Sequence, residues 1–125
     1  MLRYHLVFFL LLFCCVVNAQ KISVDNTFSP SKKSGYYNWT VFVRADDATL
    51  NSIDHVEYLL HPTFPNPQVS SYNRNNSFSY TSSGWGEFEI KTKVVFKDKR
   101  ASQYIQYWLK LQPRMQRAVI KTVSK

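Results

Sequence analysis

The chain has 125 residues, enough for one domain with its own core, and carries 16 Lys and Arg against 8 Asp and Glu, a net charge of +8. Its two cysteines, Cys14 and Cys15, both lie in an apolar N-terminal segment, so the sequence beyond them excludes disulfides, thiolate metal sites and a cysteine nucleophile. The cations are scattered along the chain, which favours a solvated basic surface over an anion-binding face and argues against nucleic acid as a partner.

The N-terminal segment has the layout of a secretory signal peptide. Arg3 precedes an unbroken apolar run over residues 6–17, and Asn18 and Ala19 follow the run. The run is shorter than the roughly 18–20 apolar residues that span a bilayer. We therefore expect cleavage after Ala19, with residues 1–19 as signal peptide, residues 20–125 as the domain, and a secreted or periplasmic location. The alternative is an uncleaved N-terminal membrane anchor.

Beyond this segment, apolar and polar residues alternate with a period of two, which is the pattern of strands with one buried face. Helical periodicity is nearly absent. Clusters of Gly, Asn, Asp and Ser separate the alternating runs, as expected for turns between short strands. The alternation predicts strands over residues 21–24, 39–45, 55–61, 87–97, 104–112 and 118–123.

The strand lengths and turn spacing predict an all-β fold, an immunoglobulin-like two-sheet antiparallel β-sandwich of about seven strands. A small barrel is the alternative architecture. The residues that the alternation turns inward are Trp39, Val41, Val43, Val56, Tyr58, Leu60, Phe88, Ile90, Val94, Phe96, Ile105, Tyr107, Leu109 and Leu111.

Enzymatic motifs are lacking in this sequence, which has no glycine-rich phosphate loop and no nucleophile elbow. His55 and His61 are six residues apart on a predicted strand, about 20 Å along its axis, and therefore too far apart to share a metal ion. Asp46, Asp47 and Asp54 fall in predicted turns, where Asp commonly caps its own backbone. We expect a protein that is not an enzyme and that uses no metal or cofactor.

Two loops hold the side chains best suited to bind a ligand. In "HPTFPNP" (residues 61–67), prolines stiffen a segment that presents an imidazole, a hydroxyl and a phenyl ring. In "GWGEF" (residues 84–88), two glycines flank an indole and leave the backbone open to close approach. Two aromatic rings with a nearby hydroxyl suit a flat, neutral guest that carries an amide. The residues alone leave a second interpretation open, in which the histidine bonds a neighbouring loop and the indole is tucked into the core.

Four segments of the chain resemble, in order, those of the YEATS domain, an immunoglobulin-type sandwich that reads acylated lysine. The resemblance runs from Trp39 to Leu111, and its middle two segments are specific in combination. The four segments are "NWTVFVRA", "IDHVEYLLHPTFPNP", "SGWGEFEIKTKVVFK" and "YWLKL".

The resemblance implies that the two loops meet and form an open-ended aromatic slot for an acyl group. Phe64 and Trp85 would be its walls. Thr63, oriented by His61, would hydrogen-bond the acyl amide, and the backbone N–H of Trp85 would hold the carbonyl. The two flanking glycines would keep the slot open, and one of two tyrosines would lie beside it. The residues assigned to the slot in this way are His61, Thr63, Phe64, Gly84, Trp85 and Gly86, with Tyr36 or Tyr37 as the flank.

The resemblance and the predicted export together bear on the partner. YEATS histone readers are nuclear, whereas this chain is expected to be exported and is similar to a stand-alone prokaryotic form. We therefore expect an acylated protein or peptide, or a small acyl-amide ligand, rather than a histone tail. The alternative function is a structural or protein-interaction domain of the cell envelope that contacts an envelope or membrane protein and binds no acyl group.

Overall fold

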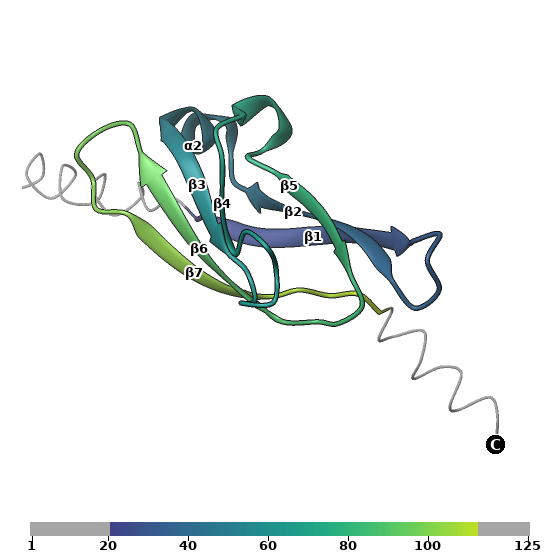
Figure 1. Ribbon diagram of the computed structural model, residues 1–125. Coiled ribbons are helices and arrows are strands. Elements are labelled where there is room, and N and C mark those ends of the chain that lie inside the picture. Colours follow the sequence, from purple (N-terminus) through teal and green to yellow (C-terminus); the bar gives the residue numbers. More distant parts are fainter. Residues whose placement is uncertain (1–20, 113–125) are drawn as a thin grey trace, which may run out of the picture.

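The computed structural model describes residues 21–112, which form two β-sheets packed face to face (Figure 1). The predicted signal peptide and the predicted strand over residues 118–123 lie outside the described residues, so both stay predictions. In the part of the chain that the structure describes, no helix combines the length and the apolar character needed to cross a membrane.

The strands divide into a three-stranded and a four-stranded sheet, and all neighbouring strands are antiparallel. The first sheet contains, in spatial order, β1 (Ser23–Pro30), β2 (Tyr37–Arg44) and β5 (Tyr80–Gly84). The second contains, in spatial order, β4 (Gln68–Ser71), β3 (Ile53–Leu59), β6 (Glu89–Phe96) and β7 (Gln103–Trp108). This arrangement confirms the predicted two-sheet sandwich.

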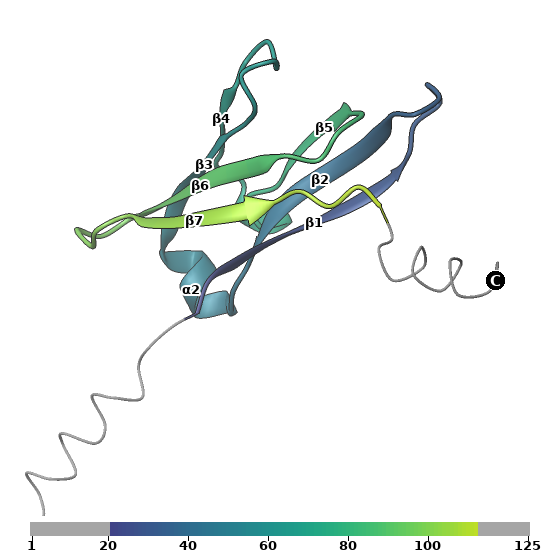
Figure 2. The same ribbon diagram turned by 90° about the horizontal axis from the view of Figure 1, so that it is seen from below.

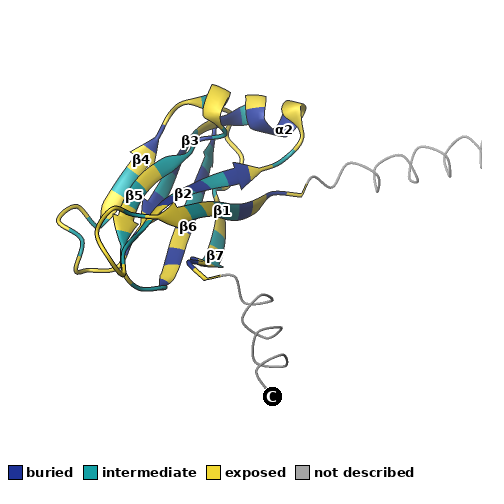
Figure 3. Cartoon of the chain, turned by 90° about the vertical axis from the view of Figure 1, so that its right-hand side faces the viewer, coloured by how far each residue is buried: buried dark blue, intermediate teal, exposed yellow. Residues whose placement is uncertain are grey.

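The core lies between the two sheets, where the alternating apolar residues of the sequence meet. Every inward-facing residue that the alternation predicts between positions 39 and 96 is buried, and so are Leu109 and Leu111. Figure 3 shows the resulting bands of buried and exposed residues along the strands. Ile105 and Tyr107 pack against the core but are only partly buried, because β7 is the edge strand of its sheet.

The structure also contains elements that the alternation did not predict. β1 continues to Pro30, and β4 and β5 are short strands with the sequences "QVSS" and "YTSSG", which show no apolar alternation. A short helix, α2 (Asp47–Ser52), forms where a turn was expected. Asp46 caps this helix by accepting a hydrogen bond of 2.7 Å from the backbone N–H of Thr49, which confirms the predicted capping role at this position.

Three connections meet at one end of the sandwich, opposite α2. They are the hairpin between β1 and β2, the loop between β3 and β4, and the turn from β5 to β6 (Figure 2). The turn from β5 to β6 also carries the chain from one sheet to the other. The fold therefore brings together the two loops that the sequence analysis singled out.

Candidate ligand-binding site

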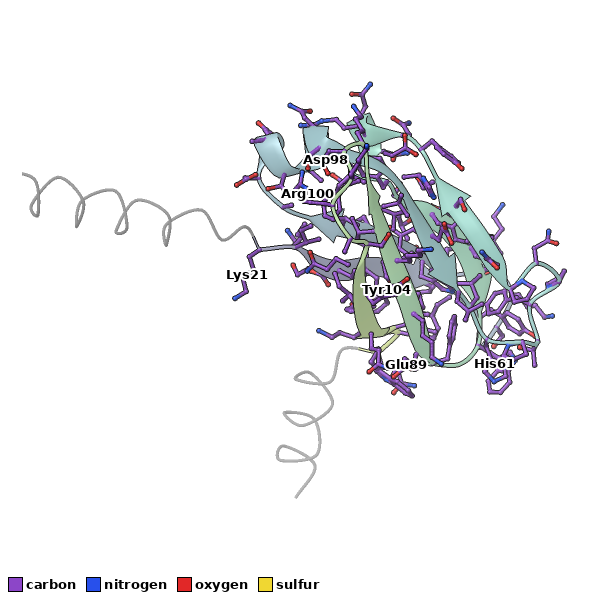
Figure 4. The ribbon with its side chains drawn as sticks, turned by 90° about the vertical axis from the view of Figure 1, so that its left-hand side faces the viewer. Lys21, His61, Glu89, Asp98, Arg100 and Tyr104 are labelled. Atoms are coloured by element: carbon purple, nitrogen blue, oxygen red, sulfur yellow. The ribbon has the colours of Figure 1, made fainter. Side chains whose placement is uncertain are left out.

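A cavity of about 340 Å³ lies where these three connections meet. Figure 4 shows His61 at this end of the molecule, far from the turn that carries Asp98 and Arg100. The two predicted loops therefore do meet, as the resemblance implied. The residues that line the cavity are Tyr36, His61, Thr63, Phe64, Pro65, Ser83, Gly84, Trp85, Gly86, Glu87 and Phe88.

The first loop is closed by hydrogen bonds of its own backbone. The N–H of Leu60 donates to the carbonyl of Pro67 over 2.6 Å, and the N–H of Phe64 donates to the carbonyl of His61 over 3.0 Å. Leu60 is buried in the core and fixes one end of the loop. The loop thus presents its polar residues on a backbone that is already ordered before any ligand arrives.

His61 and Thr63 form a hydrogen-bonded pair at the cavity. The backbone N–H of Thr63 donates to Nδ1 of His61 over 3.2 Å, and the hydroxyl of Thr63 lies 2.9 Å from the same nitrogen. With Nδ1 as the acceptor of the backbone N–H, the hydroxyl can also donate to this nitrogen. The lone pairs of the Thr63 oxygen are then left to accept a hydrogen bond from a ligand N–H.

Phe64 is half-buried and belongs partly to the core. Its ring lies 6.2 Å from that of Trp39 in an edge-to-face arrangement and 5.3 Å from that of Phe88, measured between centroids. Such aromatic pairs prefer offset or edge-to-face geometry. Packing therefore fixes the orientation of the Phe64 ring at the cavity.

Trp85 lies at the surface, with 74% of its area exposed. The indole is thus not tucked into the core, and the second interpretation of "GWGEF" is wrong on this point. A Cβ atom added at Gly86 would meet no heavy atom within 4 Å apart from its chain neighbours, whereas at Gly84 it would meet Cζ of Phe64 and Nε1 of Trp39, each at 3.9 Å. The loop around Trp85 is therefore open on the side of Gly86.

Tyr36, not Tyr37, lines the cavity. The ammonium group of Lys33 lies 4.1 Å from the centre of the Tyr36 ring, a cation–π contact within the β1–β2 hairpin. Tyr37 instead packs edge-to-face against Phe28, with 6.0 Å between ring centroids. Of the two tyrosines between which the sequence left the choice open, Tyr36 is thus the one at the cavity. The ligand-binding role of each residue stays a prediction.

Sequence reasoning missed Glu87. This residue lines the cavity, and its carboxylate accepts hydrogen bonds from the indole N–H of Trp108 and the backbone N–H of Leu111, both over 2.9 Å. These donors lie more than 20 positions away in the chain, so no local pattern predicts the contacts. The available signal was an acidic residue directly after the second glycine of "GWGEF".

Two further features lie on the outer face of the four-stranded sheet. His55 makes hydrogen bonds with Asp54 (2.7 Å) and Glu57 (3.0 Å), an arrangement that sequence reasoning did not find. A larger hollow of about 570 Å³ lies on the same face. Tyr104, which Figure 4 places there, is the one aromatic residue among the described residues that line this hollow. The described lining of the hollow offers no pair of rings to enclose a flat guest, so the smaller cavity is the candidate site for such a ligand.

Comparison with known sequences agrees with the geometry. The family model of the prokaryotic YEATS domain matches residues 37–108. The chain is similar to the AF-9 homolog of Kluyveromyces lactis, with 34% identity over 101 residues and 77% of this chain covered, and to that of Eremothecium gossypii, with 39% identity over 94 residues and 72% covered. These alignments cover 44% and 43% of the two relatives, so the chain spans less than half of their length.

Comparison with solved structures gives the same family. The yeast AF-9 homolog Yaf9 is similar with a TM-score of 0.63 and 29% identity, covering 78% of this chain and 75% of that chain. A structure of the Yaf9 YEATS domain recognizing an H3K122suc peptide has a TM-score of 0.60 and 29% identity over 76% of this chain and 77% of that one. The Yaf9 YEATS domain bound to H3K27ac has a TM-score of 0.59 and 28% identity over 76% of this chain and 78% of that one. YEATS domains are non-catalytic reader modules. On sequence and fold together, this chain belongs to the YEATS domain family.

Proposed function

We propose that the cavity binds the acyl-amide group of an acylated lysine or of a similar flat ligand, and that the protein is a non-catalytic reader. The observation that carries this proposal is the Thr63 hydroxyl, which is held by His61 at 2.9 Å beside a cluster of aromatic rings. Structures of the related Yaf9 domain with acylated histone peptides support it.

In this proposal the planar acyl-amide lies between the rings of Phe64 and Trp85. The amide N–H donates to Oγ1 of Thr63, and the carbonyl accepts the backbone N–H of Trp85. Phe64 and Trp85 both line the cavity, which supports their roles as its two walls. Stacking and one or two hydrogen bonds correspond to micromolar affinity at best, since about −8 kcal/mol gives 1 μM.

The test is a titration of the protein with acetyl-lysine and crotonyl-lysine peptides, each beside its unmodified control, followed by indole fluorescence. Trp85→Ala should abolish the response and leave the domain folded, because 74% of this residue is exposed. Phe64→Ala is a poorer test, since it also removes packing against the core. The matched control is Tyr104→Ala, an equally exposed aromatic residue outside the cavity (72% exposed).

Equal binding of acylated and unmodified peptides would contradict the reader function. The interaction-domain alternative, with an envelope or membrane protein as partner, would then take its place. Unfolding of the Trp85→Ala variant would also contradict the proposal, since it would show that the indole supports the core rather than a ligand.

We also propose that the protein is exported, so that an acylated protein, peptide or small amide outside the cytoplasm is its ligand. The support is the charged start and apolar run before Ala19. N-terminal sequencing of the protein from culture medium or periplasm should begin at Gln20. An intact Met1 on membrane-bound material would favour the N-terminal anchor instead.

A further inference from the structure

The turn that carries Trp85 has few contacts of its own to hold it in place. The indole of Trp85 is 74% exposed, and the space beside the Gly86 Cα is open to 4 Å. Neither residue can therefore be positioned by packing. The position of the Trp85 backbone must therefore depend on the neighbouring residues.

The carboxylate of Glu87 joins this turn to the last residue of β7 and to the segment that follows it. One oxygen accepts the indole N–H of Trp108 and the other accepts the backbone N–H of Leu111, both at 2.9 Å. A further hydrogen bond of 2.9 Å joins the same two segments, in which the backbone N–H of Leu109 donates to the carbonyl of Phe88, the residue that follows Glu87. Hydrogen bonds to an ionised carboxylate are stronger than those between neutral groups.

The segment that receives Glu87 is itself fixed to both sheets. Leu109 and Leu111 are buried in the core. Between them, the backbone N–H of Lys110 donates to the side-chain oxygen of Asn26 over 3.1 Å, and the side-chain amide of Asn26 donates back to the Lys110 carbonyl over 2.9 Å. Glu87 therefore bonds to a rigid support that reaches from β7 to β1.

From these contacts we infer that Glu87 is a positioning residue of the slot, which holds the turn over residues 85–87 so that the Trp85 backbone N–H faces the ligand carbonyl. The inference rests on the proposed acyl-amide function. Glu87 acts through the turn and is assigned no contact with the ligand. A site whose donors are fixed in advance loses less entropy on binding.

The test compares Glu87→Gln with Glu89→Gln. Glutamine has the size of glutamate but lacks its charge and its second acceptor oxygen. Glu89 is an exposed glutamate two residues further along the chain, outside the cavity, and serves as the matched control. Two measurements are made on each variant. They are the backbone and indole N–H resonances of ¹⁵N-labelled protein without ligand, and the affinity for an acetyl-lysine peptide beside its unmodified control.

We expect Glu87→Gln to shift the resonances of the Trp108 indole and of the Trp85 and Leu111 amides, and to leave the rest of the sheets unchanged. Affinity for the acetyl-lysine peptide should fall roughly tenfold, about the contribution of one hydrogen bond to a charged group. Glu89 pairs with Trp108 across β6 and β7, so the control is judged on the Trp85 amide and on the affinity, both of which Glu89→Gln should leave unchanged. A purely structural role would instead lower the melting temperature and disturb resonances throughout the sandwich.

An unmoved Trp85 amide in Glu87→Gln overturns the inference, as does wild-type affinity for the acetylated peptide. If the wild type does not distinguish acetylated from unmodified peptide, the proposed function fails separately. The ligand-free spectra then still decide whether Glu87 fixes the turn.

Discussion

At the scale of single residues, the hydrogen bond between His61 and Thr63 is the most specific feature of the site. It directs the threonine hydroxyl toward Nδ1 and leaves its oxygen free to accept. Thr63→Val keeps the shape and removes the oxygen, so acyl-peptide binding should weaken by about 1 kcal/mol, roughly fivefold. Calorimetric titration measures this. Thr27→Val, on the exposed face of β1, should bind as the wild type does; equal loss in both variants would contradict the role of the Thr63 oxygen.

A second single-residue prediction concerns the core. The buried hydroxyl of Tyr58 donates to the carbonyl of Phe78 over 2.6 Å, and burial raises the pKa of Tyr58 above its ordinary range. Tyr58→Phe leaves that carbonyl without its donor, so the free energy of unfolding should fall by about 1–3 kcal/mol. Urea denaturation checks this, with Tyr104→Phe as control because its hydroxyl is exposed. Equal stability of the two variants would show that the Tyr58 bond contributes nothing net.

At the scale of elements, apolar alternation predicted the strands that build the core. β2, β3 and β6 bury apolar residues on one face and β7 partly buries its own, and these inward faces follow directly from the sequence. β4 and β5 could not be predicted in this way, because their short serine-rich sequences owe their strand conformation to pairing with β3 and β2. Tertiary context commonly overrides local preference in strands.

The same limit applies to the elements of the site. Prolines and glycines marked both loops, but residue chemistry alone left open whether Trp85 faced the core or solvent. The resemblance to YEATS domains pointed to the aromatic slot, and the exposed position of Trp85 agrees with that expectation. Glu87 could not be predicted, since its partners Trp108 and Leu111 become neighbours only through the pairing of β6 with β7.

The outer face of β3 provides a prediction about pH. Burial lowers the pKa of His55, but the hydrogen bonds to Asp54 and Glu57 outweigh it, so the net pKa is raised above its ordinary value. Tyr72 stacks on the imidazole with ring centroids 4.8 Å apart. A raised folded-state pKa contributes stability that is complete below the unfolded value of about 6.5 and is lost as pH rises through the folded value.

His55→Gln should therefore lose more stability relative to the wild type at pH 6 than at pH 9. Urea denaturation of both proteins at several pH values gives the difference in unfolding free energy. Asp54→Asn should weaken the dependence of the wild-type stability on pH that arises from His55, because it removes one of the two carboxylates that favour the charged imidazole. A difference that stays constant or grows as pH rises would contradict this assignment.

At the scale of the whole molecule, the site depends on the sandwich being assembled. One loop joins two strands of the four-stranded sheet, the turn with Trp85 connects the two sheets, and Tyr36 comes from the β1–β2 hairpin. None of these segments forms the cavity alone. The proposed ligand should thus bind the folded protein and not the unfolded chain, and binding must then stabilise the fold as a whole.

The size of this stabilisation follows from mass action. At a free acetyl-lysine peptide concentration ten times the dissociation constant, the folded state gains about 1.4 kcal/mol. For a domain of this length that corresponds to a rise in melting temperature of roughly 5–10 °C. Thermal unfolding followed by circular dichroism should show this rise with the acetylated peptide, while the unmodified peptide leaves the midpoint unchanged. Trp85→Ala should melt near the wild-type temperature without peptide and show no rise with it. A rise of equal size with the unmodified peptide would mean that the stabilising contacts lie outside the slot, on a surface that does not read the acyl group.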